Sequence, residues 1–211
     1  MQAFIIAFQC AGDCSGDISW MLLHWIGFAL GGTTFIAGTT CYFFPDWQQG
    51  AAVGAWLYTI GSCGFLTVDV LEFFTFTKDP WLRSNIAMSA TGSAFYVLGS
   101  IGFIPEVATA CPWLGIWGFI LGSFCIGISQ LWKATRIGWC KCLHDNDLFT
   151  QMGVELGACL GAWCFFFGTF PLAFGSDLTQ TILYVWLVGS MFFTLGSLFL
   201  GYRHFVEATE R

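Results

Sequence analysis

Six stretches of mostly apolar residues make up most of this chain and constrain its fold more than any other feature. Each has roughly the length of about 20 residues that a transmembrane helix needs, and none alternates with the period of two expected of a membrane strand. Their approximate bounds are 21–44, 51–74, 86–104, 113–132, 153–174 and 180–202. The sequence therefore predicts an all-α integral membrane protein with six transmembrane helices.

The composition supports this class and excludes a soluble globular domain. Of the 211 residues, 56% are hydrophobic and only 9% are charged, whereas a soluble domain carries about 25% charged residues. Seven basic residues and a net charge of −6 argue against a nucleic-acid partner, because such binding depends on cations that neutralise phosphates.

The charges between the stretches predict an orientation. With six spans, all the basic residues fall on one side: Lys78, Arg83, Lys133, Arg136, Lys141, Arg203 and Arg211. The other side carries Asp46, Glu106 and Asp177. Because basic loops stay in the cytoplasm, or in its equivalent in an organelle, both termini are predicted to be cytoplasmic; which membrane is involved stays open.

The first 20 residues form a separate segment. Met1–Phe8 is apolar but too short to span a membrane, and it lacks the basic start of a signal peptide. We expect this segment, 1–20, to lie in the membrane interface or against another protein, with a loosely packed tail as the alternative. Residues 21–211 are predicted to form a single membrane domain.

One motif, G-x3-[FY]-x2-G-[ST], occurs once in every apolar stretch. Its glycines and aromatic residues are Gly31, Phe35, Gly38, Gly54, Tyr58, Gly61, Gly92, Tyr96, Gly99, Gly115, Phe119, Gly122, Gly161, Phe165, Gly168, Gly189, Phe193 and Gly196. A recurrence at this spacing indicates an internal repeat. The repeating unit is a helical hairpin, present three times at about 21–77, 84–136 and 153–205.

The motif has the chemistry of helix packing. Positions i, i+4 and i+7 share one helix face, and small residues allow helices in lipid to approach closely. We therefore expect this stripe to face neighbouring helices. A cofactor or a pore lined by the stripe is the alternative.

These residues resemble the YrhK-like domain family, whose unit is a two-helix membrane hairpin with Gly-Ser followed by phenylalanine. The matching stretches are Trp56–Phe65, Phe95–Glu106, Trp117–Ile126 and Met191–Leu200. The first and fifth apolar stretches depart from the pattern with Gly-Thr. The resemblance implies a membrane hairpin fold and assigns no catalytic residue.

Asp69 and Glu72 are the most informative charges. They are three residues apart and share a face near the end of the second stretch. Because both lie close to the predicted boundary, we expect an interfacial salt-bridge belt with Arg83, Arg136, Arg203 or His204 as partners. Ionisable residues within a span are functional candidates, so a proton or cation site is the alternative, and Glu155 is ambiguous in the same way.

His24 and His204 begin and end the set of spans. Imidazole is a common axial ligand, so either could ligate chlorophyll or haem, although a histidine at a span boundary is more often a polar anchor. Cys140, Cys142 and His144 form a weak C-x-C-x-H pattern, and no metal site is predicted from it. A disulfide between Cys41 and Cys111 is open.

No nucleophile and base, and no phosphate-binding loop, stand out, and the three lysines lie at or beyond span ends. We therefore predict a non-enzymatic structural or accessory subunit of a larger membrane complex. Its partners would be the lipid bilayer and other membrane subunits or further copies of itself, with bound structural lipids and no predicted cofactor. A channel or small-solute or ion transporter is the alternative, followed by a pigment- or haem-binding protein.

Overall fold

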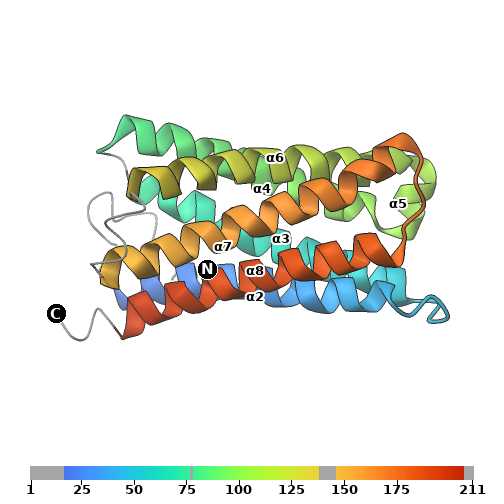
Figure 1. Ribbon diagram of the computed structural model, residues 1–211, viewed down its shortest axis with the longest axis horizontal. Helices are drawn as coiled ribbons and strands as arrows, with labels where there is room; N and C mark the ends of the chain where they lie inside the picture. The colour runs from blue at the N-terminus through green and yellow to red at the C-terminus, as the bar shows by residue number, and fades with distance from the viewer. Residues whose placement is uncertain (1–16, 77, 138–145, 207–211) are drawn as a thin grey trace.

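The computed structural model describes residues 17–76, 78–137 and 146–206. These residues form an all-helical structure, and no strand occurs among them. The six long helices are α2 (Ile18–Tyr42), α3 (Gly50–Thr75), α4 (Pro80–Gly102), α6 (Pro112–Ile137), α7 (Asn146–Thr169) and α8 (Gln180–Phe205). Two short elements, α5 (Pro105–Ala110) and the 3₁₀ helix η2 (Phe170–Phe174), lie at the end of the bundle opposite the start of α2 and the end of α8 (Figure 1).

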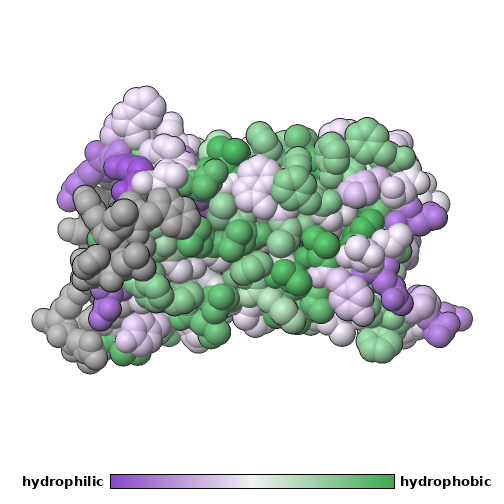
Figure 2. All heavy atoms as spheres, viewed as in Figure 1, coloured by the Kyte–Doolittle hydropathy of each residue, from purple (hydrophilic) through white to green (hydrophobic). Residues whose placement is uncertain are grey.

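Five of these helices are long and apolar enough to cross a membrane: α2, α3, α6, α7 together with η2, and α8. On the face that Figure 2 shows, apolar residues cover the middle of the bundle and polar residues lie toward its two ends. By length and composition, these helices are those of an integral membrane protein. The remaining predicted span, 86–104, corresponds to α4, which has 23 residues but a lower hydropathy.

The long helices form a closed ring. Each packs against its neighbours in the order α2, α3, α4, α6, α7, α8, and α8 returns to α2. The closest pairs are α2 with α3, α4 with α6, and α7 with α8, the same pairs that the sequence groups into hairpins. Short connections make consecutive helices antiparallel, so that α2, α4 and α7 begin at the end where α3, α6 and α8 finish (Figure 1).

Local sequence signals set several helix ends. The Asp17 carboxylate caps α2 by accepting the backbone N–H of Ser19 at 2.9 Å, and Asp79 caps α4 at Trp81 and Leu82. Helix α2 therefore begins before residue 21, where the apolar pattern alone places it, and residues 1–16 of the predicted interfacial segment lie outside the described residues.

Motif glycines bring the paired helices together. A Cβ atom at one glycine of each pair would lie 3.0 Å or less from the carbonyl oxygen of a motif glycine on the partner helix. These pairs are Gly38 with Gly54, Gly92 with Gly122, and Gly161 with Gly189. A larger side chain at these points would collide with backbone, which cannot move aside without separating the helices.

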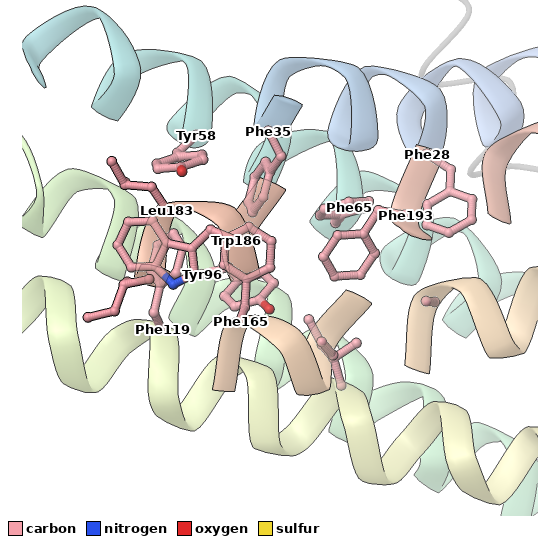
Figure 3. Close-up of a cluster of buried hydrophobic side chains, with 14 of the residues drawn as sticks. Phe28, Phe35, Tyr58, Phe65, Tyr96, Phe119, Phe165, Leu183, Trp186 and Phe193 are labelled. Carbon is pink, nitrogen blue, oxygen red and sulfur yellow. The ribbon is translucent and has the colours of Figure 1, made fainter. Parts of the chain in front are cut away.

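The six motif aromatics meet on the axis of the ring. Each is at most 1% exposed, and the ring of Phe35 has its centroid within 6.2 Å of the centroids of all five others. Figure 3 shows these rings filling the centre of the bundle together with Trp186 and Phe65. The motif therefore packs the core, and in this conformation it closes the axis to ions.

Candidate functional site: a buried ionisable cluster

Six ionisable side chains converge inside the ring, at the end where α2, α4 and α7 begin. They are His24 on α2, Asp69 and Glu72 on α3, Lys133 on α6, Glu155 on α7 and His204 on α8. At a rise of about 1.5 Å per residue, Asp69 lies about 9 Å and Glu155 about 14 Å from the helix ends. The cluster is therefore well inside the bundle. It lies between the aromatic core and the end where α2, α4 and α7 begin.

Lys133 lies between two carboxylates. Its Nζ atom is 2.9 Å from Oε2 of Glu72 and 4.0 Å from Oε2 of Glu155. The three side chains are only 10%, 14% and 12% exposed, in the order Lys133, Glu72, Glu155. The ammonium group thus makes its direct ion pair with Glu72 and only a longer contact with Glu155.

The two histidines extend this network to the end of the bundle. His24 Nε2 is 3.1 Å from Oε1 of Glu72, and His24 Nδ1 is 3.0 Å from Nε2 of His204. The indole of Trp20 stacks on the His24 ring at 4.6 Å between centroids. Both nitrogens of His24 are therefore engaged, so that binding of a pigment or haem iron there would require these contacts to break.

Asp69 accepts a hydrogen bond from the neighbouring helix, α4. It is 5% exposed and accepts a hydrogen bond of 2.5 Å from the Ser93 hydroxyl on α4. No basic side chain among the described residues forms a salt bridge with it. The polar residues that lower the hydropathy of α4 thus face the inside of the ring.

A cavity of about 50 Å³ lies beside these carboxylates. Its lining includes Asp69, Glu155, Lys133 and Gln130, with apolar side chains on the side toward the aromatic core. Gln130 is 8% exposed, and its Oε1 atom has no hydrogen-bond partner. An enclosed acceptor of this kind needs a donor or a cation, because leaving it unsatisfied costs about 1–3 kcal/mol.

A wider recess of about 490 Å³ lies outside the cavity, toward the end of the bundle. Lys133 and Glu155 line both spaces, and Glu72 lines the outer one. The ionisable cluster therefore separates an outer recess from an inner cavity.

Two surface ion pairs flank the recess. Arg136 lies 3.0 Å from Asp79, and Arg203 lies 3.3 Å from Asp147. The pKa of Asp79 is lowered, first by the backbone N–H of Leu82 and then by the hydrogen bond from Arg136. Because both arginines have carboxylate partners of their own, they add no net charge to the inner cluster.

The inner cluster is short of positive charge. Three carboxylates face one ammonium group, so two negative charges remain unbalanced when both imidazoles are neutral. Unpaired charge in a low-dielectric interior is costly. The cluster must therefore take up protons or cations, or protonate its histidines.

The structure corrects the partners that the sequence suggested. Glu72 pairs with Lys133 and His24, whereas Arg136 pairs with Asp79 and the guanidinium of Arg83 lies over the Phe73 ring at 4.4 Å. Lys133, placed at a span end by the apolar pattern, is inside the bundle because α6 continues to Ile137.

Gln130 and Ser93 were missed as site residues. Gln130 is three residues before Lys133 and shares its helix face. This spacing is the feature of the sequence that could have identified it.

The cysteines form no disulfide between Cys41 and Cys111, which are free thiols. Cys140, Cys142 and His144 lie outside the described residues. Within the described part of the chain, no group of three or more histidine, cysteine or acidic residues is arranged to hold a metal.

Comparison with known proteins finds no similar protein. No family model matches the sequence, and neither the curated proteins nor the solved structures contain a significant match to it.

Proposed function

We propose that this protein is a six-span membrane protein, with both termini on the cytoplasmic side, that carries protons through its buried ionisable cluster. The observation that carries the proposal is the excess of carboxylates over cations inside a closed helix ring. The proposed action is reversible protonation of Asp69 and Glu155, reached from one end of the bundle.

The place of α4 supports six spans. It lies between α3 and α6 in the ring and is as enclosed by them as the other helices. Its polar residues Asn85, Ser89 and Ser93 are each at most 7% exposed, so they do not face lipid. The described basic residues lie at the end of the bundle that holds the cluster, which supports the cytoplasmic side for that end.

A chain of close contacts supports a path for protons. It leads from His204 to His24, to Glu72 and to Lys133, with steps of 3.0, 3.1 and 2.9 Å. His204 would accept a proton on Nδ1 and pass its Nε2 proton to Nδ1 of His24, which releases its own Nε2 proton to Glu72. Each imidazole gains one proton and loses one, so its charge is restored.

Protonation of Glu72 would then affect Lys133. A neutral Glu72 holds the ammonium group less strongly, and Glu155 lies 4.0 Å away as a second partner. Movement of Lys133 toward Glu155 would favour release of the Glu155 proton into the inner cavity that Glu155 lines, because a nearby positive charge stabilises the carboxylate. The lysine thereby couples the two carboxylates.

The closed aromatic core favours a carrier over an open channel. Protons that reach the inner cavity meet the packed rings of Phe65 and Phe193, so transfer across the membrane requires a change of conformation. We therefore expect slow, saturable transport.

Proton uptake into liposomes tests the proposal. Purified protein is reconstituted in sodium-free choline buffer, a potassium diffusion potential is applied with valinomycin, and internal pH is followed with a trapped dye. The wild type should take up protons faster than empty liposomes, and Glu155→Gln should lose most of this activity. Glu106→Gln, an exposed glutamate at the opposite end, is the matched control and should retain it.

Wild-type uptake no faster than that of empty liposomes would overturn the proposal, as would equal uptake by the wild type and Glu155→Gln. The accessory-subunit role and the YrhK-like relationship remain predictions from the sequence. A proton site of this kind is compatible with both.

A further inference from the structure

We infer that the inner cavity is a binding site for a sodium ion, which competes with protons for Asp69 and Glu155. The inference rests on the proposed function, because it uses the same two carboxylates. It adds sodium as a second bound ion. It also adds Gln130, a residue that proton transfer does not require.

The unpartnered oxygen of Gln130 is the observation that points to a ligand. Its side chain is buried on α6 and lines the cavity, and its Oε1 atom has no hydrogen-bond donor among the described residues. A carboxamide oxygen next to carboxylates and hydroxyls is a hard oxygen donor, the type that alkali and alkaline-earth ions prefer. Asp69, Glu155, Ser89 and Ser93 supply the other oxygens of the lining.

The charges around the cavity favour a cation. Lys133 is the cationic side chain in its lining and makes its closest ion pair with Glu72, which leaves Glu155 at 4.0 Å and Asp69 without a salt bridge among the described residues. His24 lines the cavity as well, with both nitrogens engaged by Glu72 and His204. Outside, Arg203 and Arg136 are paired with Asp147 and Asp79.

The size of the cavity selects among cations. A space of about 50 Å³ exceeds the roughly 10–15 Å³ that one water needs, so it admits a bare ion with one or two waters and excludes an organic solute. Calcium takes about six to eight oxygen ligands, and magnesium demands a near-octahedral shell. The few oxygens here suit a weakly bound monovalent ion.

Competition follows from shared ligands. A proton on Asp69 or Glu155 removes the charge that holds sodium, and a bound sodium ion stabilises the ionised carboxylates. Gln130 contributes only to sodium, because an amide oxygen does not titrate in this range. Its substitution therefore separates sodium binding from proton binding.

The test is equilibrium binding of radioactive sodium to the purified full-length protein in detergent. The wild type should bind sodium more weakly as the pH falls, and Gln130→Met should reduce its affinity by about ten- to a hundredfold, the effect of losing one hydrogen-bonding group to a charge. Gln130→Glu, which keeps an oxygen and adds charge, should retain binding.

Gln151→Met is the matched control, since Gln151 lines the outer recess and not the cavity. It should bind sodium as the wild type does. Far-UV circular dichroism and SDS unfolding, measured in parallel, should be the same for Gln130→Met and the wild type, which shows that this variant is folded.

Absence of saturable sodium binding in the wild type would overturn the inference and leave water as the occupant. Equal binding by the wild type and Gln130→Met would overturn it too. Either result is compatible with normal proton uptake in choline, whereas lost proton uptake with intact sodium binding would reject the proposed function alone.

Discussion

The imidazoles of His24 and His204 lie 3.0 Å apart, nitrogen to nitrogen, although 180 residues separate them in the chain. This contact joins the first and last long helices and closes the ring beside the ionisable cluster. Because His24 also contacts Glu72, the pair connects the end of the bundle with the buried carboxylates.

The first prediction concerns this pair as a unit. His24→Ala and His204→Ala should each slow proton uptake, because either change interrupts the same chain of contacts. Residues in direct contact are coupled, so the double variant should be little slower than the slower single variant. Proton uptake rates in liposomes are measured for the wild type, the two single variants and the double variant. If the two substitutions slow uptake by independent factors that multiply in the double variant, the shared path is contradicted.

The second prediction concerns Lys133. Lys133→Met should destabilise the bundle by about 3–5 kcal/mol, the usual cost of leaving one partner of a buried ion pair uncompensated. The double variant Lys133→Met with Glu72→Gln should recover much of this loss, because it removes the unpaired charge as well. Unfolding in mixed micelles with increasing SDS measures both. A double variant less stable than Lys133→Met would show that Glu72 has another main partner.

Local patterns in the sequence account for most of the fold. Apolar length locates each helix with its ends up to seven residues from the observed ones, and the spacing of motif residues such as Phe35 and Gly38 indicates which face of each helix is buried. Both are properties of single helices, readable over one or two turns. The ring of six helices is not readable this way, because it depends on contacts between distant helices.

The candidate site shows the same division. Asp69 and Glu72 stand out because they interrupt an apolar stretch within three residues. Lys133 was missed because its helix continues past the apolar run, and a lysine near a span end is usually a surface anchor. Gln130 was missed because a single uncharged polar residue inside an apolar run gives no indication of its partners. Their meeting with Glu155 depends on the rotation of three helices about their axes, which no local pattern reports.

The third prediction tests the close approach of α4 and α6. A Cβ atom at Gly99 would lie 2.9 Å from the backbone nitrogen of Phe119 and 3.0 Å from the carbonyl carbon of Gly118. Gly99→Val should therefore destabilise the bundle by about 1–3 kcal/mol, the range for overpacking. Leu98→Val, one residue away and 47% exposed, is the control and should change SDS unfolding little. Equal stability of the two variants would show that the helices can separate at no cost.

The fourth prediction concerns the aromatic core. Phe35→Ala removes the ring that contacts the five other motif aromatics, and loss of a buried phenylalanine costs about 3–5 kcal/mol. It should also open the axis, so that proton leak into liposomes rises and no longer saturates with the proton gradient. Phe167→Ala, at a side chain that is 64% exposed, should leave leak unchanged. If the Phe35→Ala protein is folded and its proton leak equals that of the wild type, the other aromatic rings are sufficient to close the axis.

The fifth prediction is a pH dependence at the recess. Asp79 accepts hydrogen bonds from the backbone N–H groups of Trp81 and Leu82 and from Arg136, and its pKa is lowered from the ordinary value of 3.8. Its contribution to stability is therefore fully present above that ordinary value and is lost as the pH falls through the lowered folded-state pKa. At neutral pH the wild type should melt at a higher temperature than Asp79→Asn, and this difference should shrink below about pH 4. Melting temperatures of both proteins between pH 2 and 7 measure it; a difference that stays constant over this range would mean that the ionised carboxylate contributes nothing to the cap or to its pair with Arg136.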